Sequence, residues 1–72
     1  MTTNEQPILK KLGKNIAKQR KVQGITQQEL ADKLETARAY IGHIEQGIKS
    51  PSLDTIEKIA RVLKIQIKDL FS

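Results

Sequence analysis

The sequence predicts a compact all-α domain, a bundle of five helices. Apolar residues make up 38% of the 72 residues, and only Tyr40 and Phe71 are aromatic, which is thin for a sheet protein but sufficient for packed aliphatic helices. Apolar side chains recur at the three- and four-residue spacing of helices, and helix caps and stop signals divide the chain into segments of helix length.

Composition and charge exclude several classes of protein. The absence of cysteine excludes a disulfide scaffold and a Cys-based zinc site, and one histidine cannot complete a His-rich site, so no metal or cofactor is expected. No apolar run approaches the roughly 20 residues of a membrane span, and a secretory signal is lacking, so we expect a soluble, cytoplasmic protein. The net charge of +5 favours a polyanionic partner without distinguishing DNA, RNA and anionic membranes.

The first two helices are marked by their ends. Residues 1–7 have no periodicity and predict a flexible tail, and residues 8–72 predict the folded domain. A helix is expected to start beside Pro7, with Arg20 on its apolar face, and to stop at Gly24. Residues 26–29, Thr-Gln-Gln-Glu, form a T-x-x-E capping box that predicts the start of a short second helix, which ends near residue 34.

Three further helices follow. Thr36 is the expected cap of a third helix over residues 37–46, with Gly47 as its C-terminal glycine. Residues 50–52, Ser-Pro-Ser, open a fourth helix, and residues 67–71 form one last helical turn closing over the core. The expected core stripes are Ile41 and Ile44 in the third helix, and Leu53, Ile56, Ile59, Ala60 and Leu63 in the fourth.

Two short helices joined by about three residues have the layout of a helix-turn-helix, although any αα-hairpin shares it. Opposite Ile41 and Ile44, the third helix carries Ala39, Gly42, His43 and Gln46 at positions i, i+3, i+4 and i+7. This face is small, poor in charge and able to form hydrogen bonds, as suits a surface that approaches base edges. Gly42 costs about 1 kcal/mol in a helix interior, which indicates close approach either to a DNA groove or to a neighbouring helix.

From residue 24 to residue 71, the sequence resembles the helix-turn-helix domains of phage repressors and Cro proteins, the lambda-repressor-like fold. The resemblance rests on Gly-Ile-Thr-Gln-Gln-Glu-Leu-Ala-Asp-Lys-Leu at 24–34, on Tyr-Ile-Gly-His-Ile-Glu-Gln-Gly at 40–47, on Pro-Ser-Leu-Asp at 51–54 and on Asp-Leu-Phe at 69–71. The segment Arg38-x-Tyr40-Ile41-x-x-Ile44-Glu45-x-Gly47 is further similar to the controller proteins of restriction-modification systems. Glu35 departs from the pattern, since glycine is common at this turn position and a left-handed glutamate is strained.

The resemblance implies a third helix that enters the major groove of DNA and dimers that place two such helices one turn of DNA apart. It also implies an ion pair between Arg20 and Glu45 that holds the third helix. By position, it assigns base reading to Ala37, Arg38, Ala39, Gly42 and His43, base or backbone contacts to Tyr40 and Gln46, and phosphate contacts to Gln27, Gln28, Lys49 and Ser50.

We therefore expect a sequence-specific regulator of transcription that binds double-stranded DNA as a homodimer on a pseudo-palindromic operator. The alternative is a protein-interaction module of the same fold, an antitoxin or bridging factor that holds another protein. No nucleophile-base set or phosphate-cradling loop is present, so no enzymatic activity is expected. Leftover apolar residues predict a dimer interface, unless they simply finish the core: Ile48, Ile65, Ile67, Leu70 and Phe71.

Overall fold

The computed structural model of the chain describes residues 7–72. It contains four α-helices and a short final 3-10 helix, which confirms the all-α prediction but makes the last element 3-10 rather than α. Apart from Pro7, the predicted flexible tail lies outside the described residues. The elements are α1 (Pro7–Val22), α2 (Gln27–Lys33), α3 (Arg38–Glu45), α4 (Leu53–Leu63) and η1 (Ile67–Leu70).

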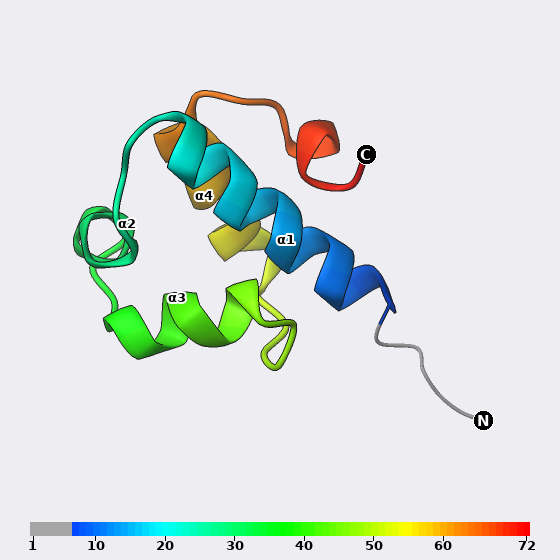
Figure 1. Cartoon of the computed structure of the whole chain (residues 1–72), viewed down its shortest axis with the longest axis horizontal. Helices are drawn as coiled ribbons and strands as arrows, with labels where there is room; N and C mark the ends of the chain where they lie inside the picture. Colours follow the sequence, from blue (N-terminus) through cyan, green and yellow to red (C-terminus); the bar gives the residue numbers. More distant parts are fainter. Residues whose placement is uncertain (1–6) are drawn as a thin grey trace.

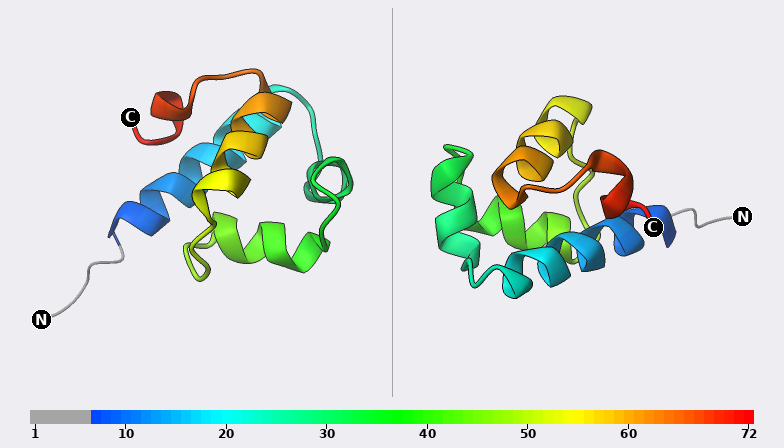
Figure 2. Two further views of the ribbon diagram at one scale, coloured as in Figure 1. Left: turned by 180° about the vertical axis from the view of Figure 1, so that it is seen from behind. Right: turned by 90° about the horizontal axis from the view of Figure 1, so that it is seen from above.

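Helix α1 is the longest element; α3, α4 and η1 pack against it, whereas α2 packs against α3 and α4 (Figure 1). Figure 1 places α2 and η1 toward opposite ends of the molecule, with α3 running below α1. The left view of Figure 2 shows the molecule from behind, with α4 at the front. The core lies between the helices and draws on every element, with Ile41 and Ile44 of α3 buried as expected. None of the helices in residues 7–72 has the length and apolar character needed to cross a membrane.

The cap signals predict the start of α2 correctly and the start of α3 one residue too early. Thr26 and Glu29 form the predicted capping box, in which the Glu29 N–H donates to Thr26 Oγ1 at 3.0 Å and the Thr26 N–H donates to Glu29 Oε1 at 2.8 Å. Thr36 was expected to cap α3, and this is wrong. The Thr36 N–H donates back to the Ala31 carbonyl at 2.9 Å, so Thr36 belongs to the turn, and Ala37 becomes the cap without a side-chain hydrogen bond.

Leu53 was expected in the core stripe of α4, and it is 82% exposed instead. The helix begins after Ser52, whose side chain accepts the Thr55 N–H at 3.1 Å. The buried part of α4 begins one turn later, at Ile56, so the first residue has the right helical position but no neighbouring helix to cover it.

Side-chain amides of α1 and of the turn that follows it bind backbone carbonyls at the ends of η1 and α4. Asn15 Nδ2 donates to the Leu70 carbonyl at 2.8 Å, and Gln23 Nε2 donates to the carbonyl of Leu63 at the end of α4. Leu70 was expected in a dimer interface, and this is wrong because the side chain is fully buried and completes the core. Ile65 is half-buried and packs against the same core.

Replacing Glu35 with glycine should stabilise the fold by about 1 kcal/mol, because Glu35 has a φ of 57° in the left-handed region that penalises a Cβ atom. Urea unfolding followed by circular dichroism measures the gain. Glu35→Ala is the matched control, since it removes the carboxylate but keeps the Cβ atom. An equal gain in Glu35→Ala would attribute the effect to charge and contradict the backbone explanation.

Candidate nucleic-acid interface

One face of α3 is open to solvent along most of its length. All of the residues expected to read bases except Gly42 are exposed on or beside this face, with Arg38 as the first residue of the helix. Behind this face, Ile41 and Ile44 fix α3 to the core. We call these exposed residues the reading strip: Ala37, Arg38, Ala39, His43 and Gln46.

Gly42 does not belong to the reading strip, because it is buried. A Cβ atom at this position would lie 3.9 Å from Nε2 and 4.0 Å from Oε1 of Gln27, so the Gln27 side chain covers the glycine. Of the two neighbours considered for this glycine, the structure shows an adjacent helix, α2, at an ordinary contact distance that leaves room for a Cβ atom. The expectation that Gly42 reads a base is therefore corrected.

Arg20 and Glu45 form a buried bidentate ion pair beneath α3. Arg20 Nε lies 2.7 Å from Glu45 Oε2 and Nη2 lies 3.0 Å from Oε1, while the side chains are only 9% and 7% exposed. The remaining terminal nitrogen, Nη1, donates to the Ile25 carbonyl at 2.8 Å. The hydrogen bond with Glu45 raises the pKa of Arg20 above its ordinary value, burial opposes the rise, and the Coulombic attraction of Glu45 adds to it.

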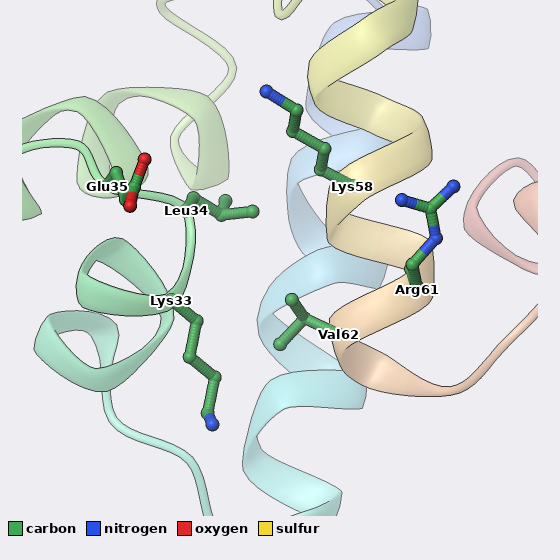
Figure 3. Close-up of a pocket in the computed structure, with 6 residues that line it drawn as sticks. All are labelled: Lys33, Leu34, Glu35, Lys58, Arg61 and Val62. Carbon is green, nitrogen blue, oxygen red and sulfur yellow. The ribbon is translucent and has the colours of Figure 1, made fainter.

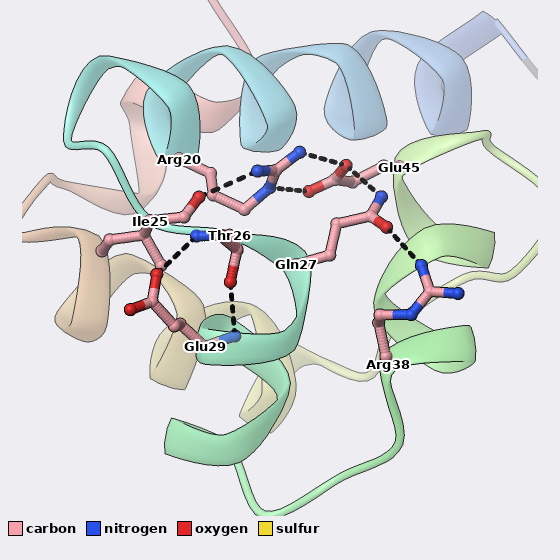
Figure 4. A network of polar contacts seen from close by, with 7 residues as sticks. All are labelled: Arg20, Ile25, Thr26, Gln27, Glu29, Arg38 and Glu45. Atoms are coloured by element: carbon pink, nitrogen blue, oxygen red, sulfur yellow. Dashed lines mark hydrogen bonds and ion pairs between the residues drawn. The ribbon is translucent and has the colours of Figure 1, made fainter.

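Gln27 extends this ion pair to the reading strip (Figure 4). Its Nε2 donates to Glu45 Oε1 at 2.9 Å, and its Oε1 accepts a hydrogen bond from Arg38 Nη1 at 3.0 Å. The result is a continuous chain of polar contacts through Arg20, Glu45, Gln27 and Arg38. The family resemblance implied a phosphate contact for Gln27. Its hydrogen bond with Arg38 was not predicted, because no local pattern shows that residues 11 positions apart meet.

The other expected contact residues are more loosely held. Gln28 Nε2 donates to Asp32 Oδ1 at 2.8 Å within α2, and Lys49 and Ser50 are exposed in the loop after α3. Unlike the exposed residues of the reading strip, Tyr40 is half-buried and packs against the core. In residues 7–72 no three His, Asp or Glu side chains gather where they could hold a metal ion.

Gly13 has a structural role that was not predicted from the sequence. A Cβ atom there would lie 2.4 Å from the Ile44 carbonyl oxygen and 2.5 Å from that of Glu45, closer than real Cβ contacts come. The end of α3 therefore packs directly on the backbone of α1. A glycine inside an otherwise regular helix was the available signal, since such a glycine is unfavourable unless something packs against it.

The reading strip and its support lie within the segment that a known family model matches. That model is described as helix-turn-helix, and it matches residues 16–70, from the middle of α1 to the end of η1. The chain belongs to the helix-turn-helix family. The resemblance found in the sequence is thereby confirmed.

Relatives of this helix-turn-helix protein include controller proteins. The control protein C.BamHI of Bacillus amyloliquefaciens is 46% identical over 46 residues, which are 64% of this chain and 57% of that protein. Among solved structures, the restriction-modification controller C.AhdI of Aeromonas hydrophila matches with a TM-score of 0.83 and 35% identity, over 88% of this chain and 96% of that one.

A second controller structure is similar in fold and was solved on DNA. C.Esp1396I, described as a tetramer in complex with its natural 35-base-pair operator, matches with a TM-score of 0.74 and 29% identity, over 90% of this chain and 96% of that one. These similarities agree with the controller-like segment around Arg38.

Proposed function

We propose that this helix-turn-helix protein is a regulator of transcription that binds double-stranded DNA with sequence specificity. The observation that carries the proposal is an exposed α3 face with Arg38 at its start, held against the core by Ile41 and Ile44 and tied to a buried ion pair. A rigid helix with a free polar face suits insertion into the major groove. The operator complex of C.Esp1396I supports the same arrangement.

Within this proposal, the reading strip contacts base edges. The Arg38 guanidinium can donate two hydrogen bonds to O6 and N7 of guanine, and the methyl groups of Ala37 and Ala39 suit contact with thymine. His43 and Gln46 extend the strip along α3. Lys49, Ser50 and Gln28 are exposed beside it and are assigned to phosphates, which position the protein without reading sequence.

Selection of bound fragments from a random DNA pool tests the proposal. We expect an enriched motif for the natural sequence and, for Arg38→Ala, loss of preference at one base pair, corresponding to about 1–3 kcal/mol of discrimination. Gln27→Ala should reduce the preference at that same base pair, because Gln27 holds Arg38 at 3.0 Å. Failure to enrich any motif would refute sequence-specific binding.

Lys49→Ala is the matched control for this selection. As an exposed phosphate contact, Lys49 carries no sequence information, so the variant should bind all sites more weakly and keep the motif. The slope of log affinity against log salt should also fall by about one unit. The alternative function, a protein-interaction module that acts as an antitoxin or bridging factor, predicts neither the motif nor the salt dependence.

We further propose that the protein binds a pseudo-palindromic operator as a dimer, with two α3 helices about 34–36 Å apart. Ile67 and Phe71 are exposed on and beside η1, and Ile65 is half-buried nearby in sequence, so this C-terminal patch is the proposed interface. Ile48 is exposed as well, but its loop lies across α1 from η1 and does not extend the patch (Figure 1).

Replacing Ile67 with glutamate should shift the protein toward monomer, because a charge would be buried in an apolar interface. Light scattering after size exclusion, over a dilution series, measures the change. Ile48→Glu is the control of equal chemistry outside the patch, and it should leave the dimer intact. A natural protein that stays monomeric at hundreds of micromolar would remove the interface.

A further inference from the structure

A groove lies between α4 and the end of α2, outside both surfaces assigned above. It consists of two adjoining cavities of about 240 and 200 Å³ that share Leu34, Glu35 and Lys58. No residue of the reading strip or of the C-terminal patch lines it. We call it the α2–α4 groove, and its lining residues are Lys33, Leu34, Glu35, Thr36, Tyr40, Thr55, Lys58, Arg61 and Val62.

The larger cavity combines an apolar floor with a positively charged rim (Figure 3). Leu34 and Val62 face each other from the two sides, and both are half-buried against the core. Three cations line this cavity, Lys33 on α2 and Lys58 and Arg61 on α4, against a single acidic residue, Glu35; in Figure 3 the Arg61 side chain extends away from Leu34. The groove therefore offers apolar contact and excess positive charge at one place.

Most of this positive charge is not neutralised by the chain. Lys58 lies 3.3 Å from the exposed Asp54 carboxylate, one turn away on α4. Within residues 7–72, Lys33 and Arg61 form no ion pair. Lys33 and Arg61 are exposed on two different helices that flank the apolar floor, so their long side chains can turn to receive carboxylates from one bound segment.

The backbone at the rim is held in an unfavourable conformation. Glu35 lines both cavities and has a φ of 57°, where glycine would be less strained. Strained residues cluster at binding sites more than elsewhere. Because Glu35 lines both cavities, its carboxylate can accept a hydrogen bond from a backbone N–H of a peptide bound in the groove.

We propose that the α2–α4 groove is a docking site for an acidic segment of a partner protein. An apolar side chain of that segment packs between Leu34 and Val62, and flanking carboxylates bind Lys33 and Arg61. The apolar floor favours a peptide over nucleic acid, because a phosphate backbone has no group to fill it. Since the groove is separate from the reading strip, such a partner can bind while α3 engages DNA, and this inference does not depend on the proposed function.

The probe is a synthetic peptide, acetyl-Asp-Glu-Leu-Asp-Phe-Glu-Asp amide, titrated into the full chain labelled with nitrogen-15. We expect the backbone amide resonances of the groove residues to shift and those of the reading strip to stay. A peptide with serine in place of Leu and Phe should bind at least about tenfold more weakly. Equal binding of the serine peptide, or no shift at the groove, would overturn the proposal.

Charge reversal on the protein provides the second arm. Lys33→Glu and Arg61→Glu should each weaken peptide binding by about tenfold or more, whereas Lys14→Glu, an exposed lysine of α1 outside the groove, should change it by less than about twofold. An equal loss in Lys14→Glu would mean that only net charge attracts the peptide, and would overturn the proposal. Arg61→Gln repeats the test if glutamate disturbs the end of α4.

A mixed-sequence DNA duplex identifies the other candidate occupant. Under the proposal, Arg61→Glu lowers peptide affinity and leaves affinity for the duplex close to that of Lys14→Glu. If Arg61→Glu instead weakens duplex binding as much as peptide binding, while Lys14→Glu weakens neither, the groove is a phosphate contact and the proposal is wrong. Thermal unfolding of each variant confirms that the fold is intact.

Discussion

Gly13→Ala is expected to remove a large part of the free energy of unfolding. The added Cβ atom would lie 2.4 Å from the Ile44 carbonyl oxygen and 2.7 Å from the Glu45 carbonyl carbon, and backbone atoms of a packed helix cannot turn aside. Overpacking costs about 1–3 kcal/mol and occasionally more. A core in a domain of this size supplies only about 3–5 kcal/mol, so little stability would remain.

Gly42→Ala is the matched control for this prediction. It places the same methyl group in α3, where the nearest atoms of Gln27 lie 3.9 and 4.0 Å away, which is ordinary contact. Relief of the glycine penalty should then stabilise the helix by about 0.5–1 kcal/mol. Urea unfolding of both variants by circular dichroism gives opposite signs if the packing argument holds, and a stable Gly13→Ala would contradict the close crossing of α1 and α3.

Glu45→Ala is expected to cost about 3–5 kcal/mol, because it removes one partner of a buried ion pair and leaves the other charge uncompensated. Arg20 is only 8% exposed and would keep just its hydrogen bond to the Ile25 carbonyl. Gln27 would also lose the acceptor of its Nε2 hydrogen bond. Unfolding by urea and by heat measures the loss, which is comparable to the whole stability of such a domain.

Asp54→Ala provides the comparison with a surface ion pair. The Lys58–Asp54 pair is 3.3 Å long, and its side chains are 54% and 71% exposed, so its removal should change stability by less than about 1 kcal/mol. If Glu45→Ala proves as mild as Asp54→Ala, the buried pair does not support the fold. Glu45→Ala should also lose DNA binding through unfolding, so a fold measurement must accompany any binding assay.

Because the pKa of Arg20 is raised in the folded state, its contribution to stability is fully present below the unfolded pKa. It is lost only as the pH rises through the folded pKa. For a guanidinium, that window lies in strongly alkaline solution, so the charge of Arg20 is constant across neutral pH. The Arg20 side of the pair between α1 and α3 therefore stays charged throughout the neutral range.

Local patterns predicted most of the helices because caps and apolar spacing act within one helix. The capping box at Thr26 and Glu29 joins residues three positions apart, and it predicted the start of α2 directly. Gly24 and Gly47 both follow helix ends with positive φ, as stop signals should. The prediction that Thr36 caps α3 was wrong because the Thr36 N–H donates to the Ala31 carbonyl of the preceding helix, which keeps Thr36 in the turn.

The sequence by itself determined the order of the helices, the inward face of each one and the family to which the chain belongs. Tertiary structure alone decided that Gln27 covers Gly42 and binds Arg38, that Leu70 completes the core, and that Leu53 stays exposed. The physical reason is that a periodic pattern specifies which side of a helix is apolar. Which neighbour covers that side, and how closely, depends on contacts between residues far apart in the chain, such as Gly13 with Ile44.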